Sequence, residues 1–233
     1  MTARPAAFIF DLDGTLVDSG LDVALAANGV RVTFGLPELP VPVLVGYVGD
    51  GVGLLLERAL GHDLAGGQTG QPVAAARLAE AHAVFADLYG RHLLDNTRLY
   101  PGVRSVLARF ADLPLHLATN KPRAFTDAIL DGLGLEGVFR RIVGGDEAPA
   151  RKPDPAHLAA CLAGLEVAPG RVAVVGDSPN DVLAARGLGA VAVGCTYGLG
   201  APARVRAAEP DHLIDAITDL VDLFGFRGTG GGG

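Results

Sequence analysis

The chain has few of the residues that build covalent or metal cross-links. Cysteine occurs only twice in 233 residues, at Cys161 and Cys195, with no C-x-x-C pair and no cysteine–histidine spacing typical of zinc sites. The six histidines show no ligand spacing either. These absences argue against a disulfide scaffold or a structural zinc site. We expect both thiols to be small apolar packing residues in a reducing compartment, the cytoplasm.

Long apolar runs and basic clusters are also missing. Apolar residues make up 49% of the chain, but they occur in strand-sized stretches. Crossing a bilayer takes roughly 20 consecutive apolar residues, and the first residues contain no secretion signal. The net charge is −7, without a basic run, which argues against nucleic acid as a partner. The sequence therefore predicts a globular cytoplasmic protein with no membrane or nucleic-acid partner; it gives no indication of oligomeric state.

Lysine is the rarest charged residue. Arginine supplies 17 of the 19 cationic side chains, and Lys121 and Lys152 are the two lysines. An ammonium is compact, whereas a guanidinium is a planar fork, so a chain biased toward arginine keeps lysine where a compact cation is preferred. Both lysines follow a predicted strand or loop and have polar neighbours, which indicates a role at a site.

Strands and helices alternate over most of the chain. Apolar stretches of strand length occupy residues 8–10, 115–118, 141–143, 172–175 and 190–193, and helical patterns occupy 104–110, 123–133, 155–165 and 180–188. Such alternation is typical of a parallel sheet with helices on both faces. We therefore predict an α/β fold with a Rossmann-like core.

Residues 20–96 have a different character. Helical patterns cover residues 21–34, 43–48, 52–60 and 73–94, and no convincing strand pattern separates them. We predict an all-helical block, residues 20–96, inserted into a core made of residues 1–19 and 97–233.

Two carboxylates follow the first predicted strand. Asp11 and Asp13 are one residue apart and precede Gly14. Ionised carboxylates this close repel each other unless a cation or a proton lies between them. The pattern fits a Mg²⁺ site in which one carboxylate also acts as a nucleophile. Taken alone, it fits an acidic turn equally well, because Asp-Gly is a common turn sequence.

Polar residues follow the other predicted strands as well, and the carboxyl ends of parallel strands meet at one edge of a sheet. The candidate site residues are Asp11, Asp13, Thr119, Asn120, Lys152, Asp177 and Asp181. This set fits phosphoryl transfer, in which Mg²⁺, Lys152 and donors at Thr119 and Asn120 would neutralise the phosphoryl oxygens. Lys121 has two interpretations. Its side chain caps the helix after Pro122, or its positive charge raises the electrostatic potential near the phosphate.

Four segments, residues 11–19, 118–120, 152–155 and 176–181, resemble the four ordered motifs of the haloacid dehalogenase superfamily. The resemblance implies a Rossmann-like core with a helical cap inserted after the first motif. It implies that Asp11 is the nucleophile and forms an aspartyl-phosphate. Asp13 would be the acid to the leaving alcohol and then the base to water, while Thr119 and Lys152 bind the phosphoryl group. An acid at Asp13 favours a phosphatase, because a halide leaves without a proton.

The same resemblance implies a Mg²⁺ site. Asp177 would hold the ion together with the Asp11 carboxylate and the Asp13 backbone carbonyl. Asp181 would support this arrangement from behind the ligands.

Further stretches resemble bacterial phosphoglycolate phosphatases: residues 47–51, 55–60, 100–103, 119–122, 143–146 and 196–198. That resemblance implies Mg²⁺-dependent hydrolysis of 2-phosphoglycolate, a small phosphorylated metabolite, to glycolate and phosphate. The same chemistry on pyrophosphate or a sugar phosphate, a hexose-phosphate mutase reaction, and a catalytically silent binding protein on this fold remain the alternatives.

Four glycines lie within residues 46–53, directly before a predicted helix. Glycines let backbone N–H groups approach a ligand closely, and a helix N-terminus favours an anion. Gly49, Asp50 and Gly51 are therefore candidate contacts for a substrate carboxylate, although Asp50 would repel it if its side chain points inward. Alternatively, these glycines serve only as a hinge for the cap.

Overall fold

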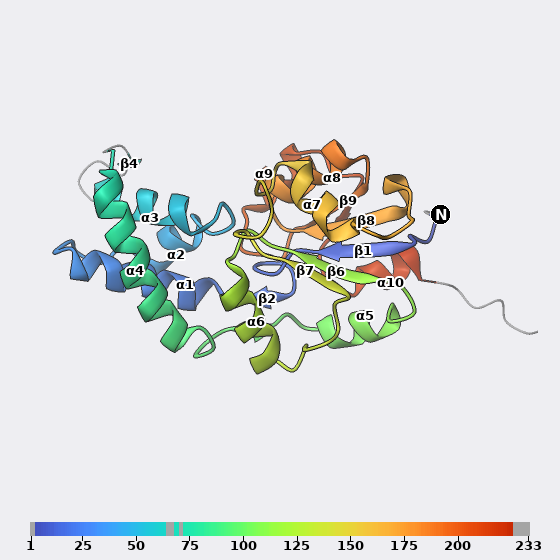
Figure 1. The fold of residues 1–233 in the computed structure, drawn as a ribbon, viewed down its shortest axis with the longest axis horizontal. Helices are drawn as coiled ribbons and strands as arrows, with labels where there is room; N and C mark the ends of the chain where they lie inside the picture. Colours follow the sequence, from blue (N-terminus) through green and yellow to red (C-terminus); the bar gives the residue numbers. More distant parts are fainter. Residues whose placement is uncertain (1–2, 64–67, 70–71, 226–233) are drawn as a thin grey trace, which may run out of the picture.

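The computed structural model describes residues 3–63, 68–69 and 72–225, built around one parallel sheet (Figure 1). The sheet has six strands in the order β10-β9-β8-β1-β6-β7. Their bounds are β1 Ala7–Phe10, β6 Leu115–Ala118, β7 Arg141–Val143, β8 Val172–Gly176, β9 Val191–Cys195 and β10 His212–Ile214. The predicted α/β core is confirmed, and β10 is an edge strand that the sequence pattern did not reveal.

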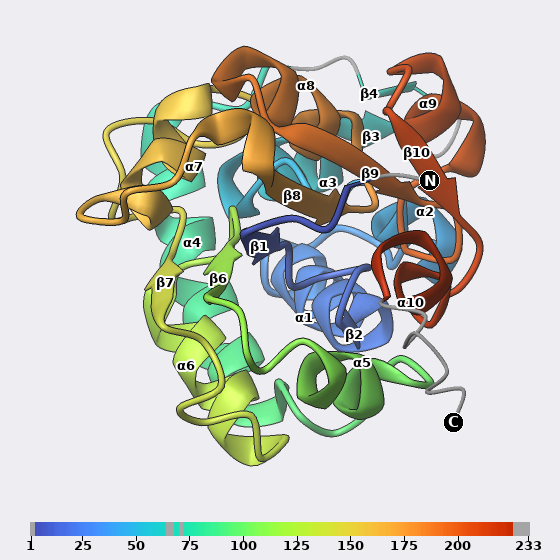
Figure 2. The ribbon, with the colours of Figure 1, turned by 90° about the vertical axis from the view of Figure 1, so that its right-hand side faces the viewer.

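Helices cover both faces of this sheet (Figure 2). In β1, Phe8 and Phe10 belong to one apolar cluster and Ala7 and Ile9 to another, because successive side chains point to opposite faces. The first cluster includes residues of α5 (Val103–Arg109), α6 (Arg123–Gly132) and α10 (Asp219–Phe224); the second includes residues of α7 (Pro155–Leu162) and α8 (Pro179–Leu188). The single-turn η1 (Pro169–Arg171) precedes β8, and α9 (Pro202–Ala207) follows β9. Burial on both faces explains the continuous apolar run of β1.

A helical block lies beyond the carboxyl ends of the strands, at the left of Figure 1. It contains α1 (Gly20–Thr33), α2 (Val41–Val45), α3 (Val52–Gly61) and α4 (Ala75–His92). Helix α2 begins two residues before its predicted start, because Pro42 lies in the first turn, where a missing N–H costs no helix bond. The block also holds a short antiparallel pair that was not predicted, β3 (His62–Asp63) with β4 (Gln68–Thr69).

The two ends of the helical block meet at a narrow neck. Strand β2 (Val17–Asp18) pairs antiparallel with β5 (Arg98–Leu99), so the chain enters and leaves the block side by side. Asp22, in the first turn of α1, accepts hydrogen bonds of 2.7–3.1 Å from Asn96 and Thr97. Burial alone would raise the pKa of Asp22, but these hydrogen bonds outweigh it and lower the pKa. Asp22 therefore ties the start of the block to its end.

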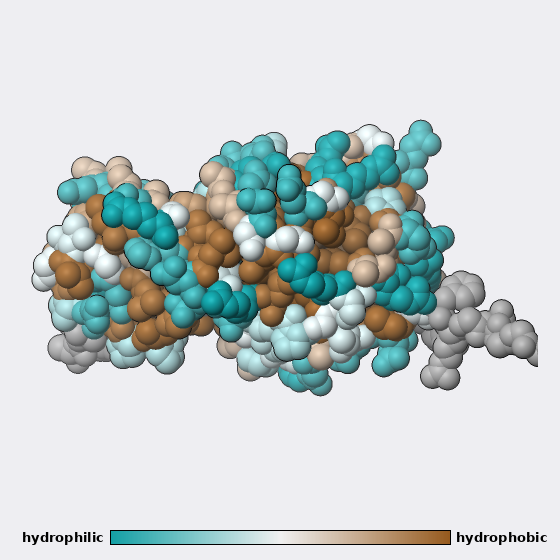
Figure 3. Space-filling view, turned by 90° about the horizontal axis from the view of Figure 1, so that it is seen from below, coloured by the Kyte–Doolittle hydropathy of each residue, from teal (hydrophilic) through white to brown (hydrophobic). Residues whose placement is uncertain are grey.

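Seen from below, the surface mixes apolar and polar side chains over both the helical block and the sheet body (Figure 3). Within the described residues, no helix is both long enough and apolar enough to cross a bilayer.

One buried histidine makes the stability of the sheet sensitive to pH. His116 lies in β6 in register with Ile9, is 2% exposed, and neither ring nitrogen has a hydrogen-bond partner in the part of the chain that the structure describes. Burial, assisted by the charges of Arg140 and Arg141, lowers its pKa from 6.5 to about 4. The folded state therefore keeps this imidazole neutral.

We expect the free energy of unfolding to fall as the pH drops from about 7 to about 5. In this range His116 becomes protonated in the unfolded chain but stays neutral in the folded protein. His116→Leu should reduce this fall by about 1–2 kcal/mol at pH 5, measured by urea unfolding at both pH values. His92→Ala removes an exposed histidine that is paired with Asp95; as the control, it should change the fall far less than His116→Leu does. An identical pH dependence in His116→Leu and wild type would contradict this account.

Candidate active site

Three neighbouring strands bring the candidate residues together. Strands β8, β1 and β6 are adjacent and parallel, so the residues after each strand lie side by side at one edge. Asp177 follows β8, Asp11 follows β1 and Thr119 follows β6. The edge faces the helical block (Figure 1), and open parallel sheets bind ligands at the carboxyl ends of their strands.

The turn after β1 needs a glycine at one position. Gly14 has φ +83°, and its N–H donates to the Val17 carbonyl at 2.8 Å. A Cβ at this position would lie 1.9 Å from the nearer Asp177 carboxylate oxygen. Only glycine combines this backbone conformation with so close an approach. The turn can therefore pack Asp177 directly beside the β1 end.

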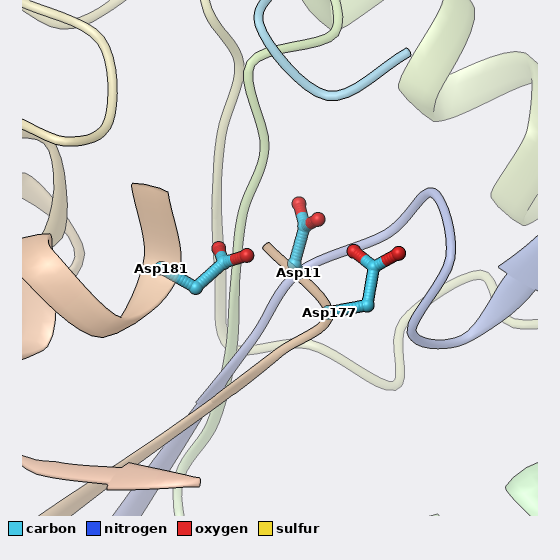
Figure 4. Close-up of side chains that lie close together, drawn as sticks. All are labelled: Asp11, Asp177 and Asp181. Atoms are coloured by element: carbon cyan, nitrogen blue, oxygen red, sulfur yellow. The ribbon is translucent and has the colours of Figure 1, made fainter. Parts of the chain in front are cut away.

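Asp11, Asp177 and Asp181 form a buried acidic cluster (Figure 4). Each offers a carboxylate oxygen within 4.8 Å of the others, and the three residues are 8%, 4% and 2% exposed. In Figure 4, Asp11 and Asp177 point in the same direction, whereas Asp181 approaches Asp11 from the side of α8. Three carboxylates this close require compensating positive charge.

Lys152 supplies one of those charges. Its Nζ lies 2.7 Å from Asp11 Oδ1 and 2.6 Å from Asp181 Oδ1. Burial alone would lower the pKa of Lys152, but the two carboxylates outweigh burial and raise it. The ammonium is therefore a fixed cation beside the predicted nucleophile.

Asn120 holds the backbone of Lys152 in place. The Asn120 Oδ1 accepts from the Lys152 N–H at 3.0 Å, and its Nδ2 donates to the Lys152 carbonyl at 3.0 Å and to the Gly49 carbonyl at 3.1 Å. The side-chain amide is thus committed to the lysine loop and to the helical block. The motif predicts a phosphate contact for Asn120, whereas its side-chain amide holds the lysine loop.

Asp181 is held from two sides. Its Oδ2 accepts from the Ser178 N–H at 3.1 Å and from Ser178 Oγ at 2.7 Å, which forms the capping box of α8, while Oδ1 receives Lys152. Both oxygens therefore already have donors. This arrangement suits a residue that orients Lys152 better than one that coordinates a metal.

Burial raises the pKa of both Asp11 and Asp177. Burial, opposed by Lys152 and reinforced by Asp181, raises the pKa of Asp11 to about 7. Burial and the neighbouring carboxylates raise the pKa of Asp177 well above its ordinary value. A divalent cation between the two would remove the need for protons. Buried carboxylate oxygens are hard ligands, so the donor set fits Mg²⁺.

Asp13 lies slightly apart from this cluster, in contact with Lys121 and Ser19. Its two oxygens each accept from Lys121 Nζ at 2.9 Å, and Oδ1 also accepts from Ser19 Oγ at 2.5 Å. Burial alone would lower the pKa of Lys121, but Asp13 and Tyr89 outweigh it and raise the pKa. The Lys121 ammonium thus points at Asp13 and not at the helix after Pro122.

A cavity opens beside these groups, with a volume of about 40 Å³. Its polar lining includes Asp11, Asp13, Thr119, Asn120 and Lys121, and its walls come from α1, α3, α4, α6 and the loop before α3: Val23, Val48, Gly49, Gly51, Val52, Leu55, Phe85, Tyr89 and Phe125.

The three candidate contacts from the glycine-rich loop do not all reach the cavity. Gly49 and Gly51 line the cavity, whereas Asp50 does not. The Asp50 carboxylate accepts from Arg58 at 2.5 Å and from Asn180 Nδ2 at 2.7 Å. Asp50 therefore joins the helical block to the start of α8.

Thr119 directly follows β6, lines the polar end of the cavity and is 1% exposed. Its Oγ1 accepts from the Lys121 N–H at 3.2 Å, and its own N–H donates to the Val143 carbonyl at 3.1 Å. The hydroxyl proton therefore remains available to a ligand oxygen.

Sequence reasoning missed the aromatic wall of the cavity. Phe85 and Tyr89 of α4 and Phe125 of α6 occupy apolar positions of predicted helices. A helical pattern identifies such positions as buried, but it does not distinguish packing from a cavity lining.

Comparisons with known proteins agree with the motifs. The family model for haloacid dehalogenase-like hydrolases matches residues 5–189. A phosphoglycolate phosphatase of Chromobacterium violaceum is 39% identical over 222 residues, which is 93% of this chain and 95% of the relative. One of Haemophilus influenzae is 35% identical over 216 residues, 92% and 96% of the two chains.

A solved structure has the same fold. The crystal structure described as a predicted phosphoglycolate phosphatase from Haemophilus somnus matches with a TM-score of 0.86 and 30% identity. The match covers 96% of this chain and 99% of the other.

The acidic cluster predicts a stabilising metal effect. At about 100 times its Kd, Mg²⁺ should raise the melting temperature by roughly 5–10 °C relative to a sample with chelator. Asp177→Asn should abolish most of that rise, because it removes one anionic ligand. The matched control is Asp154→Asn, which keeps a capping side chain on α7 away from the cluster. Equal rises in wild type and Asp177→Asn, by scanning calorimetry, would show that Mg²⁺ does not bind at this cluster.

Proposed function

The chain belongs to the haloacid dehalogenase-like hydrolase family, and from that premise we propose that it is a Mg²⁺-dependent phosphatase that hydrolyses 2-phosphoglycolate to glycolate and phosphate. The observation that carries this proposal is the placement of Asp11 in the lining of a small cavity that Asp13 also lines, 2.7 Å from the Lys152 ammonium. The phosphoglycolate phosphatases among its relatives support the choice of substrate.

Asp11 is the nucleophile in the proposed mechanism. One oxygen of Asp11 is held by Lys152, which leaves the other to attack phosphorus. The P–O bond to the glycolate oxygen breaks as the bond to Asp11 forms. Lys152 and the Thr119 hydroxyl neutralise the phosphoryl oxygens. Asp11 and Asp177 would hold Mg²⁺, which would supply further neutralising charge to the phosphoryl oxygens.

Asp13 moves the protons. As an acid it protonates the departing glycolate oxygen, and as a base it then takes a proton from the water that attacks the phosphorus of the aspartyl-phosphate. That second step releases inorganic phosphate and restores the Asp11 carboxylate. Ser19 and Lys121 fix the orientation of the Asp13 carboxyl group. Such fixed geometry lowers the entropy cost of proton transfer.

The helical block would act as a cap over this chemistry. We assign residues 20–96 to the cap and residues 1–19 and 97–233 to the catalytic core. The β2–β5 neck is the natural hinge between them, and the contacts of Asn120 with Gly49 and of Asp50 with Asn180 hold the two parts together. Closing such a cap keeps bulk water from the reacting groups.

The cavity favours a small leaving group. Apart from its polar end, it is lined by apolar and aromatic side chains, and its volume is about 40 Å³. A sugar would leave several hydroxyls without partners there, and the second phosphate of pyrophosphate would lose much of its hydration. Glycolate presents one methylene and one carboxylate. The cytoplasm remains the predicted location, consistent with two free, buried cysteines.

A substrate panel tests this proposal. With phosphate release as the readout, 2-phosphoglycolate should have a higher kcat/KM than glycerol phosphate, a glucose phosphate or pyrophosphate. Asp50→Asn should preserve this ranking, because the Asp50 carboxylate is paired with Arg58 and Asn180 outside the cavity. A higher kcat/KM for a sugar phosphate or pyrophosphate would overturn the substrate assignment.

A further inference from the structure

Among the residues that line the cavity, Lys121 is the sole cation. It is 8% exposed, and its Nζ lies 2.9 Å from both Asp13 oxygens. The same Nζ is 4.8 Å from the centre of the Tyr89 ring. An anionic group entering this apolar space therefore meets one ammonium, from the core, beside the predicted acid.

Tyr89 places a second polar group in the same cavity. The residue is 1% exposed, and its hydroxyl lies beside the Lys121 ammonium, whose pKa it helps to raise, without forming a geometrically complete hydrogen bond to any residue that the structure describes. Its ring is packed between Phe85, with centroids 5.3 Å apart, and Phe125, with centroids 5.1 Å apart. Leaving a buried hydroxyl unpaired is unfavourable, so a ligand that accepts a hydrogen bond there gains a donor already in position.

The geometry points to a carboxylate subsite made by Lys121 Nζ and the Tyr89 hydroxyl. This inference rests on the proposed phosphatase function and specifies how its substrate is chosen. The phosphoryl group occupies the end of the cavity at Asp11 and Thr119, and the leaving group extends past Asp13 toward α4. Its carboxylate then meets the ammonium and accepts from the tyrosine hydroxyl.

This subsite explains selection for short 2-hydroxy acid phosphates. Because Lys121 contacts Asp13, the carboxylate it binds must lie close to the oxygen that Asp13 protonates. A carboxylate one carbon from the ester oxygen satisfies this condition, whereas a longer chain carries its carboxylate beyond Lys121. The phosphate esters of short 2-hydroxy acids are therefore the matching substrate class.

The glycine-rich loop is a weaker candidate for the same task. The Gly49 carbonyl faces the core, where it accepts from Asn120 Nδ2. A carbonyl oxygen at this contact between the helical block and the core repels a carboxylate, whereas the Lys121 ammonium attracts it. The loop would then shape the cavity without reading the substrate charge.

The test compares two substrates that differ at the carboxylate, 2-phosphoglycolate and ethyl phosphate. The quantity measured is the ratio of their kcat/KM values, because both substrates release an alcohol that Asp13 would protonate and only one carries a carboxylate. Lys121→Met should lower this ratio roughly 10- to 100-fold, and Lys121→Arg should retain part of it. Tyr89→Phe should lower the ratio roughly 10-fold. Tyr47→Phe is the matched control, because the Tyr47 hydroxyl contacts His62 and Tyr47 does not line the cavity.

The outcomes separate this inference from the proposed function. If wild type prefers 2-phosphoglycolate and both Lys121→Met and Tyr89→Phe lower the ratio, the subsite is supported. Equal losses on both substrates would overturn the subsite and leave the proposed function intact. A wild-type enzyme that does not prefer 2-phosphoglycolate to ethyl phosphate would overturn both. Tyr89→Phe removes one oxygen atom from a well-packed ring, so it decides the question even if Lys121→Met does not fold.

Discussion

The contact of Lys152 with Asp11 and Asp181 is the interaction on which the site depends. An ammonium buried between two carboxylates is stable only when its hydrogen bonds and its surroundings hold it in place. Here Ser178 fixes Asp181, and Asn120 fixes the Lys152 backbone. Positive charge is thereby placed at the proposed nucleophile before any substrate arrives.

The rest of the architecture follows from the need to bring these groups to one point. Asp11 follows β1, Asn120 follows β6 and Asp181 lies on α8 after β8, so three adjacent parallel strands deliver them to one edge. Parallel strands require crossover helices, and these cover both faces and bury the strands. The rigidity of that core keeps the carboxylates close despite their repulsion.

The helical block contributes chemistry of a different kind. Its walls are apolar, so the polar contacts in the cavity are concentrated at the core side and at Tyr89. In such surroundings each charge acts more strongly than in water. The block supplies most of the apolar lining of the cavity, and the core supplies its charged groups.

The sequence predicted the parts that depend on local pattern. Apolar strand stretches located β6 and β7 in full and β1 to within one residue, and the carboxylates after β1 and β8 indicated where the site lies. Very short pairs such as β2–β5 escaped detection, because two residues have no readable period. The contacts of the Asn120 and Tyr89 side chains could not be predicted for another reason. Their directions depend on elements far away in the chain: Asn120 on Gly49 and Lys152, Tyr89 on Phe125.

The central claim is that Asp11 attacks phosphorus and carries the phosphoryl group, and trapping that species tests it most directly. Enzyme mixed with radiolabelled 2-phosphoglycolate and Mg²⁺ is quenched in acid within the first turnover, digested and analysed by mass spectrometry. The account predicts a hydroxylamine-sensitive phosphoryl group on the peptide that contains Asp11, and none in Asp11→Asn, whose amide cannot attack. Full turnover by Asp11→Asn, or label on a peptide without Asp11, would contradict it.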